Sequence, residues 1–290
     1  MITCLALSAS LDVTYLVDSF EVGAIHRPSR VLKLPGGKAL NVARAIAVLG
    51  APVGAIAVFG GHTGELMAEL LADSGVALRV VRDVAETRSC VTIADEAGLT
   101  EIYEPSAPLG PGVLDAVVGE LARLEDTSWL VLAGSVPDGT DLAVLGRAIL
   151  GCRERGIRIA IDTHGAALTA LLESVQPDLV KVNRFEAAAL LGEPTDAPLE
   201  RLAEGLRART GRLVVVTDGA HGAIAVDGES VVSVGPPVRG LYSVGSGDCF
   251  LAGFLVALDS GATLSGALAL ATATAAANAA TPGAALFQTP

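Results

Sequence analysis

Residues 244–255, VGSGDCFLAGFL, place one carboxylate, Asp248, between a glycine-rich turn and an unbroken apolar run. Gly245 and Gly247 allow the backbone to turn sharply, so that successive N–H groups point into one concavity. The apolar run predicts a helix whose N-terminus faces the same point, and such a terminus favours anions. Asp248 is then either a simple helix-start carboxylate that binds free N–H groups or a functional carboxylate beside an anion site.

An amide-lined anion site beside a carboxylate is what phosphoryl transfer to an alcohol requires. The amides stabilise the charge on the moving phosphoryl group, and the carboxylate accepts the hydroxyl proton. The sequence lacks a Walker A motif, since Gly37-Lys38 is followed by Ala39, and it lacks a complete G-x-G-x-x-G motif. We therefore expect neither a P-loop nor a dinucleotide-binding site.

A second glycine-rich stretch, PGGKALNVARAIAVLG, covers residues 35–50. Its glycines permit close approach of the backbone to a ligand, and Asn41 at the following helix start can hydrogen-bond hydroxyl groups. Lys38 supplies a cation in an otherwise acidic chain. A tight turn with a solvated lysine and an asparagine cap would explain the same residues without a ligand.

The charge and composition exclude several kinds of partner. A net charge of −12 over 290 residues argues against nucleic-acid and anionic-membrane binding, because few cations are available to neutralise phosphates. The four cysteines are far apart, which is typical of buried thiols in a reducing cytosol. The N-terminus lacks a secretory pattern, and the charge-free segment 260–290 favours a packed internal helix over a membrane span. We therefore expect a cytoplasmic protein.

Short apolar runs alternate with helical patterns, which predicts βαβ units around a central, mostly parallel sheet flanked by helices. The predicted strands are residues 52–59, 128–134, 157–162, 179–183 and 212–219. The predicted helices are one that ends before Gly50, followed by 64–74, 111–125, 141–155, 185–191 and 198–209. Segments of about 12–34 and 88–104 indicate antiparallel β structure instead, the second with a turn at Asp95–Gly98. We expect them to form a small β-sheet that serves as a lid or a dimer surface.

The two glycine stretches together resemble the two signature regions of the ribokinase-like (PfkB) carbohydrate kinases, in the same order along the chain. VKVNRFEAAALLG (180–192) is similar to that family's K-x-N-x-x-E region, and VVVTDGAHGAIAV (214–226) to its nucleotide-side turn. The resemblance runs over nearly the whole chain. It implies a single ribokinase-like α/β domain over residues 1–290, with the small β-sheet as its lid.

Within that family, the chain is most similar to the 1-phosphofructokinase and tagatose-6-phosphate kinase branch, through Lys38, Thr87-Arg88 and LAGSVP (132–137). This branch implies an ATP- and Mg²⁺-dependent kinase of a ketohexose phosphate: fructose-1-phosphate, tagatose-6-phosphate or fructose-6-phosphate. The implied partners are thus a small-molecule sugar phosphate and ATP.

The resemblance also implies site residues. Asp248 is the implied base, and the amides of Gly245, Ser246 and Gly247 are the implied anion hole. Sugar hydroxyls are assigned to Asp12, Gly37 and Asn41, and the existing phosphate of the sugar to Lys38, Arg88 and Ser135. The nucleotide is assigned to Thr217, Gly219, Gly222, Ala277 and Asn278. Mg²⁺ is assigned, through water, to Asn183 and Glu186.

Some residues depart from the family pattern. The segment ALSASLD (6–12) keeps Asp12 but lacks an asparagine and a proline, and Ala39 and Val182 replace a glycine and a proline. A kinase of an unphosphorylated sugar or nucleoside, or a noncatalytic sugar- or nucleotide-binding relative, stays open as an alternative. A homodimer through the lid segments is a hypothesis that rests on their exposed edges.

Overall fold

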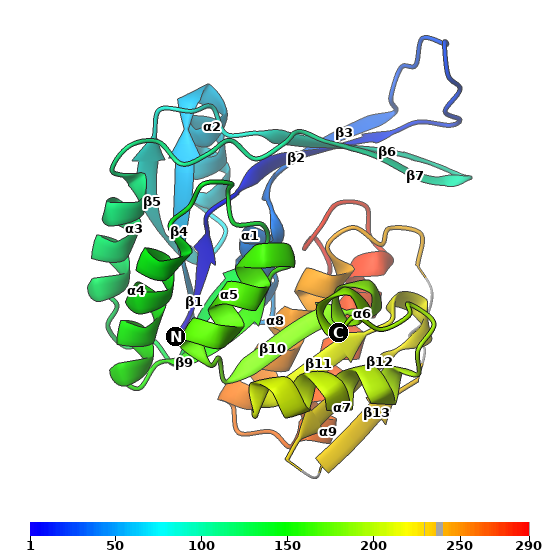
Figure 1. Ribbon diagram of the computed structural model, residues 1–290. Helices are drawn as coiled ribbons and strands as arrows, with labels where there is room; N and C mark the ends of the chain where they lie inside the picture. Colours follow the sequence, from blue (N-terminus) through cyan, green and yellow to red (C-terminus); the bar gives the residue numbers. More distant parts are fainter. Residues whose placement is uncertain (229, 236–239, 290) are drawn as a thin grey trace.

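The computed structural model describes residues 1–228, 230–235 and 240–289, and within them the larger sheet has nine strands (Figure 1). Their order is β13-β12-β11-β10-β9-β8-β1-β4-β5. Neighbouring strands run parallel, except that β12 is antiparallel to both β11 and β13. The predicted central, mostly parallel sheet is confirmed. The strands are β1 Ile2–Ala6, β4 Val53–Gly60, β5 Val76–Asp83, β8 Trp129–Ala133, β9 Arg158–Asp162, β10 Leu179–Asn183, β11 Leu213–Thr217, β12 Ala223–Asp227 and β13 Ser230–Val234.

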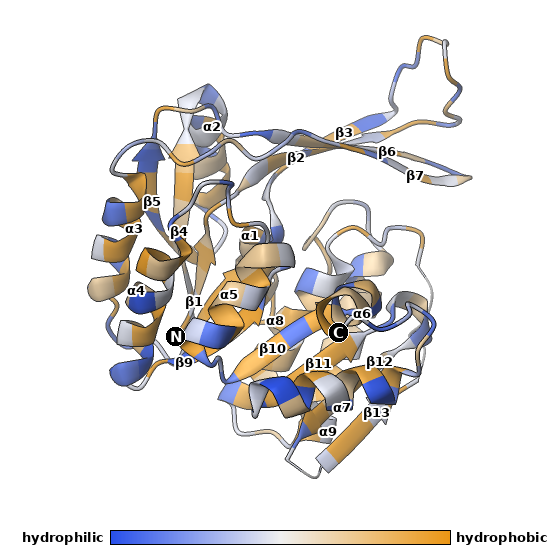
Figure 2. Cartoon of the chain, viewed as in Figure 1, coloured by the Kyte–Doolittle hydropathy of each residue, from blue (hydrophilic) through white to orange (hydrophobic). Residues whose placement is uncertain are grey.

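Helices cover both faces of this sheet, because successive side chains of each strand point to opposite faces. In β1, Ile2 and Cys4 join one apolar core, whereas Leu5 joins the other. The first face is covered by α1 Lys38–Val48, α2 Gly61–Leu71, α8 Ser246–Asp259 and α9 Leu264–Ala279. The second face is covered by α3 Val113–Ala122, α4 Leu142–Glu154, α5 Gly165–Val175, α6 Arg184–Leu191 and α7 Leu199–Thr210. The strands are accordingly apolar on both sides (Figure 2).

The predicted strands and helices lie within a few residues of the observed ones, but several elements were not predicted. These are β1, β5, β12, β13 and α5. Helix α5 buries Leu168, Leu171 and Val175, so its apolar spacing is helical. Its N-cap residue, His164, makes no side-chain cap bond within the described chain, so the usual polar start signal is missing.

The predicted small sheet is present as four strands in the order β3-β2-β6-β7, and it projects from the top of the main body (Figure 1). Its strands are β2 Ser10–Leu16, β3 Arg30–Gly36, β6 Ser89–Asp95 and β7 Gly98–Tyr103. The β6–β7 hairpin is antiparallel and turns at Asp95–Gly98, as predicted. The β2–β3 pair is also antiparallel, and the two antiparallel pairs are joined through β2 and β6, which run parallel. Between the two hairpins, the chain passes through α1, β4, α2 and β5 of the main body.

The charge-free C-terminal region forms the packed helix α9, as predicted. At Gly253 of α8, a Cβ atom would lie 2.7 Å from Thr274 Oγ1 of α9, so close packing of the two helices requires the glycine. Among the described residues, none of the helices has the length and apolar character needed to cross a membrane. The four cysteines are buried and free.

The topology fixes where a ligand can bind. From β1 the chain builds one side of the sheet through β4 and β5, and it then builds the other side through β8, β9, β10 and β11. In open α/β sheets, ligands bind outside the carboxyl ends of the strands where the strand order reverses. That point lies between β1 and β8.

Candidate active site

Residues that follow the carboxyl ends of five strands line one cavity of about 590 Å³ at this point. The starts of α1 and α8 close it from the side of the first helix layer. The cavity therefore gathers most of the site residues predicted from sequence. Those that line it are Asp12, Gly37, Lys38, Asn41, Arg88, Ser135, Asn183, Thr217, Gly245, Gly247 and Asp248.

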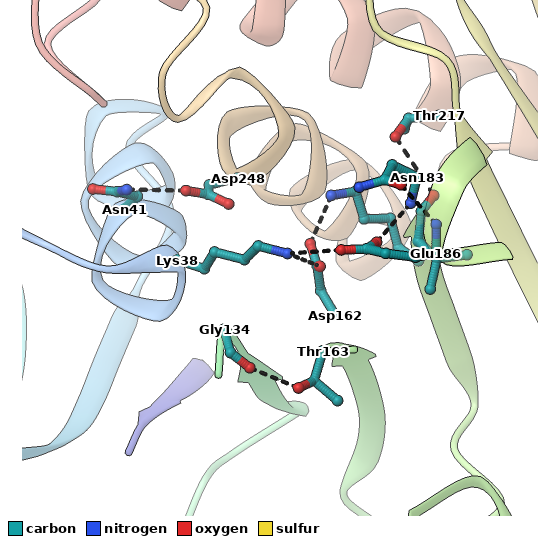
Figure 3. A network of polar contacts seen from close by, with 11 residues as sticks. Lys38, Asn41, Gly134, Asp162, Thr163, Asn183, Glu186, Thr217 and Asp248 are labelled. Carbon is teal, nitrogen blue, oxygen red and sulfur yellow. Dashed lines mark hydrogen bonds and ion pairs between the residues drawn. The ribbon is translucent and has the colours of Figure 1, made fainter. Parts of the chain in front are cut away.

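Asp248 lies in the first turn of α8, and its side chain is buried. Asn41 Nδ2 of α1 donates a hydrogen bond of 2.9 Å to Asp248 Oδ2 (Figure 3). Burial raises the pKa of Asp248 to about 6, although the positive charges of Lys38 and Lys181 and the Asn41 bond oppose this rise. A carboxylate of this kind is ionised at neutral pH and is still basic enough to accept a hydroxyl proton.

The turn before α8 presents two amides rather than the three predicted. The Ser246 amide already donates to the Ser243 carbonyl at 3.0 Å. Within the described chain, the Gly245 and Gly247 amides have no acceptor. Gly245 is also required for its backbone, since its φ is +75° and a Cβ there would lie 2.6 Å from Ala284 Cβ. The anion hole expected from sequence therefore reduces to these two glycine amides.

A buried carboxylate that was not among the predicted site residues lies beside Asp248. Asp162, at the end of β9, is fully buried and pairs with Lys38 Nζ at 2.9 Å and with Lys181 Nζ at 2.6 Å (Figure 3). Burial alone would raise the pKa of Asp162, but the two lysines outweigh it and lower the pKa to about 2. Asp162 in turn raises the pKa of Lys38. A Cβ at Gly247 would lie 3.2 Å from Lys181 Nζ, so this cation lies beside the start of α8.

A signal for this cluster was present in the sequence. Lys181 lies in the middle of the apolar strand LVKVN, where it is 4% exposed, and a lysine is rarely buried without a charged partner. Asp162 ends the neighbouring strand RIAID, and the carboxyl ends of neighbouring parallel strands meet at one edge of a sheet.

Asn183 and Glu186 form a capping box at the start of α6. The Glu186 amide donates to Asn183 Oδ1 at 2.9 Å, and the Asn183 amide donates to Glu186 Oε2 at 2.8 Å. The other oxygen, Oε1, lies 3.6 Å from Lys38 Nζ (Figure 3). In the described residues there is no cluster of three or more His, Cys, Asp or Glu side chains that could hold a metal. One carboxylate oxygen near the cavity instead fits a cation that keeps most of its water and is bound largely by substrate phosphates.

Asp12 also lines the cavity and lies on β2 of the small sheet. Ser10 Oγ donates to Asp12 Oδ1 at 2.7 Å, and a Cβ at Gly36 would overlap the Asp12 carboxylate. Burial raises the pKa of Asp12, against the opposing effects of the Ser10 bond and the buried Arg44 guanidinium. Close packing against Gly36 therefore fixes the direction of this carboxylate.

Arg88 lies near Asp12 at the base of the small sheet. Arg88 NH1 donates to the Glu104 carbonyl at 2.9 Å, and its buried Nε has no partner within the described chain. The preceding residue, Thr87, is tied to Gly60 by two hydrogen bonds of 2.9 Å. Arg88 is thus a cation on a fixed backbone at the wall of the cavity.

A second cavity, of about 460 Å³, adjoins the first and is mostly apolar. Thr217, Ser246 and Gly247 contribute to it, as do Gly219 and Gly222 of the predicted nucleotide-side turn. Ala277 and Asn278, also predicted to lie near the nucleotide, do not line it; Asn278 is fully buried, and Ala277 is partly buried. The lining residues of α9 are Thr272, Ala275, Ala276 and Ala279.

Comparisons with known proteins agree with this geometry. The family model described as "pfkB family carbohydrate kinase" matches residues 2–290. Phosphofructokinase-2 from Escherichia coli, in its tetrameric inhibited form, is 31% identical with a TM-score of 0.88, covering 96% of this chain and 93% of that chain. The same enzyme in complex with fructose-6-phosphate is 31% identical with a TM-score of 0.87, covering 95% and 92%.

A more distant structure shows the same fold. It is described as a possible 1-phosphofructokinase from Thermotoga maritima, is 23% identical with a TM-score of 0.86, and the match covers 98% of this chain and 93% of that chain.

Proposed function

Because the chain belongs to the pfkB family of carbohydrate kinases, and is thus an ATP-dependent sugar phosphate kinase, we propose that its acceptor is a ketohexose phosphate. Fructose-6-phosphate, fructose-1-phosphate and tagatose-6-phosphate are the candidates. One observation carries this proposal: the Asp248 carboxylate and the Gly247 amide face the same cavity as Asp12 and Arg88. One substrate could thus meet all four groups that the reaction needs: a base, an anion hole, a group for sugar hydroxyls and a cation for its phosphate.

In the proposed reaction, Asp248 accepts the proton of the acceptor hydroxyl. The acceptor oxygen forms a bond to the γ-phosphorus of ATP, the bond from that phosphorus to the β–γ bridging oxygen breaks, and ADP leaves. Asn41 holds the carboxylate through the 2.9 Å bond to Oδ2, which leaves Oδ1 for the hydroxyl.

Charge on the moving phosphoryl group would be stabilised by the Gly245 and Gly247 amides and by the two lysines. Lys181 Nζ lies beside Gly247, and Asp162 holds both ammonium groups. Such donors are effective because they are oriented before the reaction and are shielded from water. The ammonium of Lys38 points toward Asp162 and Glu186, so we assign it to this cluster as well as to the phosphate of the sugar (Figure 3).

We propose that Asn183 and Glu186 orient Mg²⁺ through water, with Glu186 Oε1, which is not used by the capping box, as the carboxylate oxygen that faces the hydrated ion. When bound, Mg²⁺ would neutralise charge on the phosphates of ATP. The capping box holds Glu186 at the edge of the cavity, and its neighbour Lys38 limits the negative charge there.

For the acceptor, Asp12 and Asn41 are proposed to bind sugar hydroxyls, with the Gly37 backbone close to the sugar. Arg88 and Ser135 are proposed to bind its existing phosphate. The position of Arg88 in the cavity wall supports this assignment, because guanidinium donors bind phosphate strongly. Nucleotide binding is assigned to the apolar cavity that Gly219 and Gly222 line.

A homodimer through the small sheet remains a proposal. Apolar side chains are exposed along this sheet and its β2–β3 loop: Val22, Ile25, Val31, Ile102 and Tyr103. The relative from Escherichia coli has been observed as a tetramer. The molar mass in solution tests this, and a monomer at micromolar concentration would contradict it.

An ADP-release assay over a panel of acceptors tests the proposed function. The panel pairs the three ketohexose phosphates with fructose, ribose and adenosine. We expect kcat/KM for at least one ketohexose phosphate to exceed that of every unphosphorylated acceptor by at least about tenfold, the effect of one hydrogen bond to a charged group. A preference for an unphosphorylated acceptor would contradict the proposal.

A further inference from the structure

The turn that presents the Gly245 and Gly247 amides is held from behind by one side chain, Asn278 of α9. Asn278 Nδ2 donates to the Val244 carbonyl at 2.8 Å and to Ser246 Oγ at 3.1 Å. These bonds reach the residues on either side of Gly245. The first bond orients the 244–245 peptide unit, which carries the Gly245 amide, and the second holds the side chain of Ser246, the residue before Gly247.

The carbonyl oxygen of the same side chain binds two other segments. Asn278 Oδ1 accepts a bond from the Ala285 amide at 2.8 Å, and Cys249 Sγ lies 3.3 Å from it as a thiol donor. Asn278 is fully buried, and these contacts use its two donor and two acceptor positions. The side chain is thus saturated by protein groups, which excludes direct contact with a nucleotide.

The Ala285 contact extends this support to the C-terminal segment. Ala285 has φ of +53°, a left-handed conformation that is unfavourable for a residue with a Cβ. Its bond to Asn278 helps to hold it there, and the neighbouring Ala284 lies directly against Gly245. Asn278 therefore joins the turn, the first residues of α8 and the segment that covers them.

We propose that Asn278 is the positioning residue of the anion hole. It acts through the backbone of residues 244–246 and touches neither substrate. This inference rests on the proposed function, in which the Gly245 and Gly247 amides stabilise the phosphoryl group. Because such stabilisation depends on orientation before the reaction, loss of Asn278 lowers kcat and leaves acceptor binding almost unchanged.

The test compares Asn278→Asp and Asn278→Leu with wild type. Asn278→Asp keeps the size of the side chain but puts a carboxylate oxygen in place of the Nδ2 donor that faces the Val244 carbonyl. Asn278→Leu removes all polar contacts of the side chain without adding a charge. We expect kcat to fall about 10²-fold in both, the effect of losing one anion-hole donor, with KM for the sugar phosphate close to wild type. A fall confined to the aspartate would overturn the inference, because it would trace the effect to the new charge.

Thr274→Val is the matched control. Thr274 lies one turn earlier on α9, is fully buried and bonds only the Leu270 carbonyl of its own helix within the described chain, so the variant loses a buried hydroxyl at the same α8–α9 interface. We expect it to lower Tm with kcat close to wild type. An equal loss of kcat in Thr274→Val would show that Asn278 acts only through general packing.

Hydrogen exchange of residues 243–249 provides a readout that does not depend on turnover. Exchange there should be faster in both Asn278 variants than in wild type and in Thr274→Val. Absence of turnover in wild type with every acceptor would contradict the proposed function alone. Unchanged exchange and unchanged kcat in folded Asn278 variants would overturn this inference while leaving the proposed function intact.

Discussion

Asn41 and Asp248, 207 positions apart in the chain, are joined by a hydrogen bond of 2.9 Å from Nδ2 to Oδ2. The bond connects the starts of α1 and α8, the two helices that follow the glycine-rich turns. It lowers the pKa of Asp248 against the stronger effect of burial. The two sequence motifs thus meet in one cavity, and in the proposed function a change in either motif should affect the same reaction.

The pH dependence of turnover should report Asp248. Since its pKa is about 6 and the base must be ionised, kcat/KM should fall as pH decreases through about 6. Asn41→Ala removes a bond that favours the ionised form, so the acid limb should move to higher pH. The measurement is log(kcat/KM) against pH for both proteins. An acid limb at the same pH in both would contradict the role of Asn41 in lowering the pKa of Asp248.

Gly245→Ala should lose activity as well as stability. The new Cβ would lie 2.6 Å from Ala284 Cβ, in a backbone with φ of +75°. Gly261→Ala is the matched control, since Gly261 has φ of +82° and, among the described residues, nothing lies within 4 Å of the point its Cβ would occupy. Only backbone strain of about 1 kcal/mol is expected there. Thermal unfolding and kcat of both variants test this, and equal effects in the two would contradict the steric explanation.

Asp162→Asn should destabilise the protein by about 3 to 5 kcal/mol, because it removes the partner of two lysines and leaves Lys181 charged and buried. Asp162→Asn combined with Lys181→Met should be less destabilised than Asp162→Asn alone. Denaturant unfolding of the two single variants and the double variant gives this coupling. Additive effects would show that the pair does not interact as described.

Arg88→Met should raise KM for the sugar phosphate by roughly 10- to 100-fold, as expected for loss of a charge-assisted hydrogen bond. KM for ATP should change little, because Arg88 lines the sugar end of the first cavity and not the second. Initial rates, measured while one substrate is varied at a time, give the two KM values separately. An equal change in both KM values would place Arg88 outside the phosphate pocket.

The sequence predicted the parallel sheet from its buried apolar runs, which are local patterns, and it predicted most of the residues that line the cavity through the resemblance to the family. Asp162 was missed because its importance depends on two lysines from other elements, of which Lys38 lies 124 positions away. The role of Asn278 depends on which face of α9 is buried. Helix α9 is uniformly small and apolar, so its sequence does not identify that face.

We predict that Asp248 is the base, and the Asp248→Asn variant is the sharpest test of this role. Its kcat should fall about 10²- to 10⁴-fold, with KM values for both substrates close to wild type. Since the pKa of Asp248 is raised from 3.8 to about 6 by burial, ionisation of this side chain costs roughly 3 kcal/mol of folding free energy at pH 7, and Tm should rise in the variant. A folded Asp248→Asn protein with kcat close to wild type would contradict the assignment of the base.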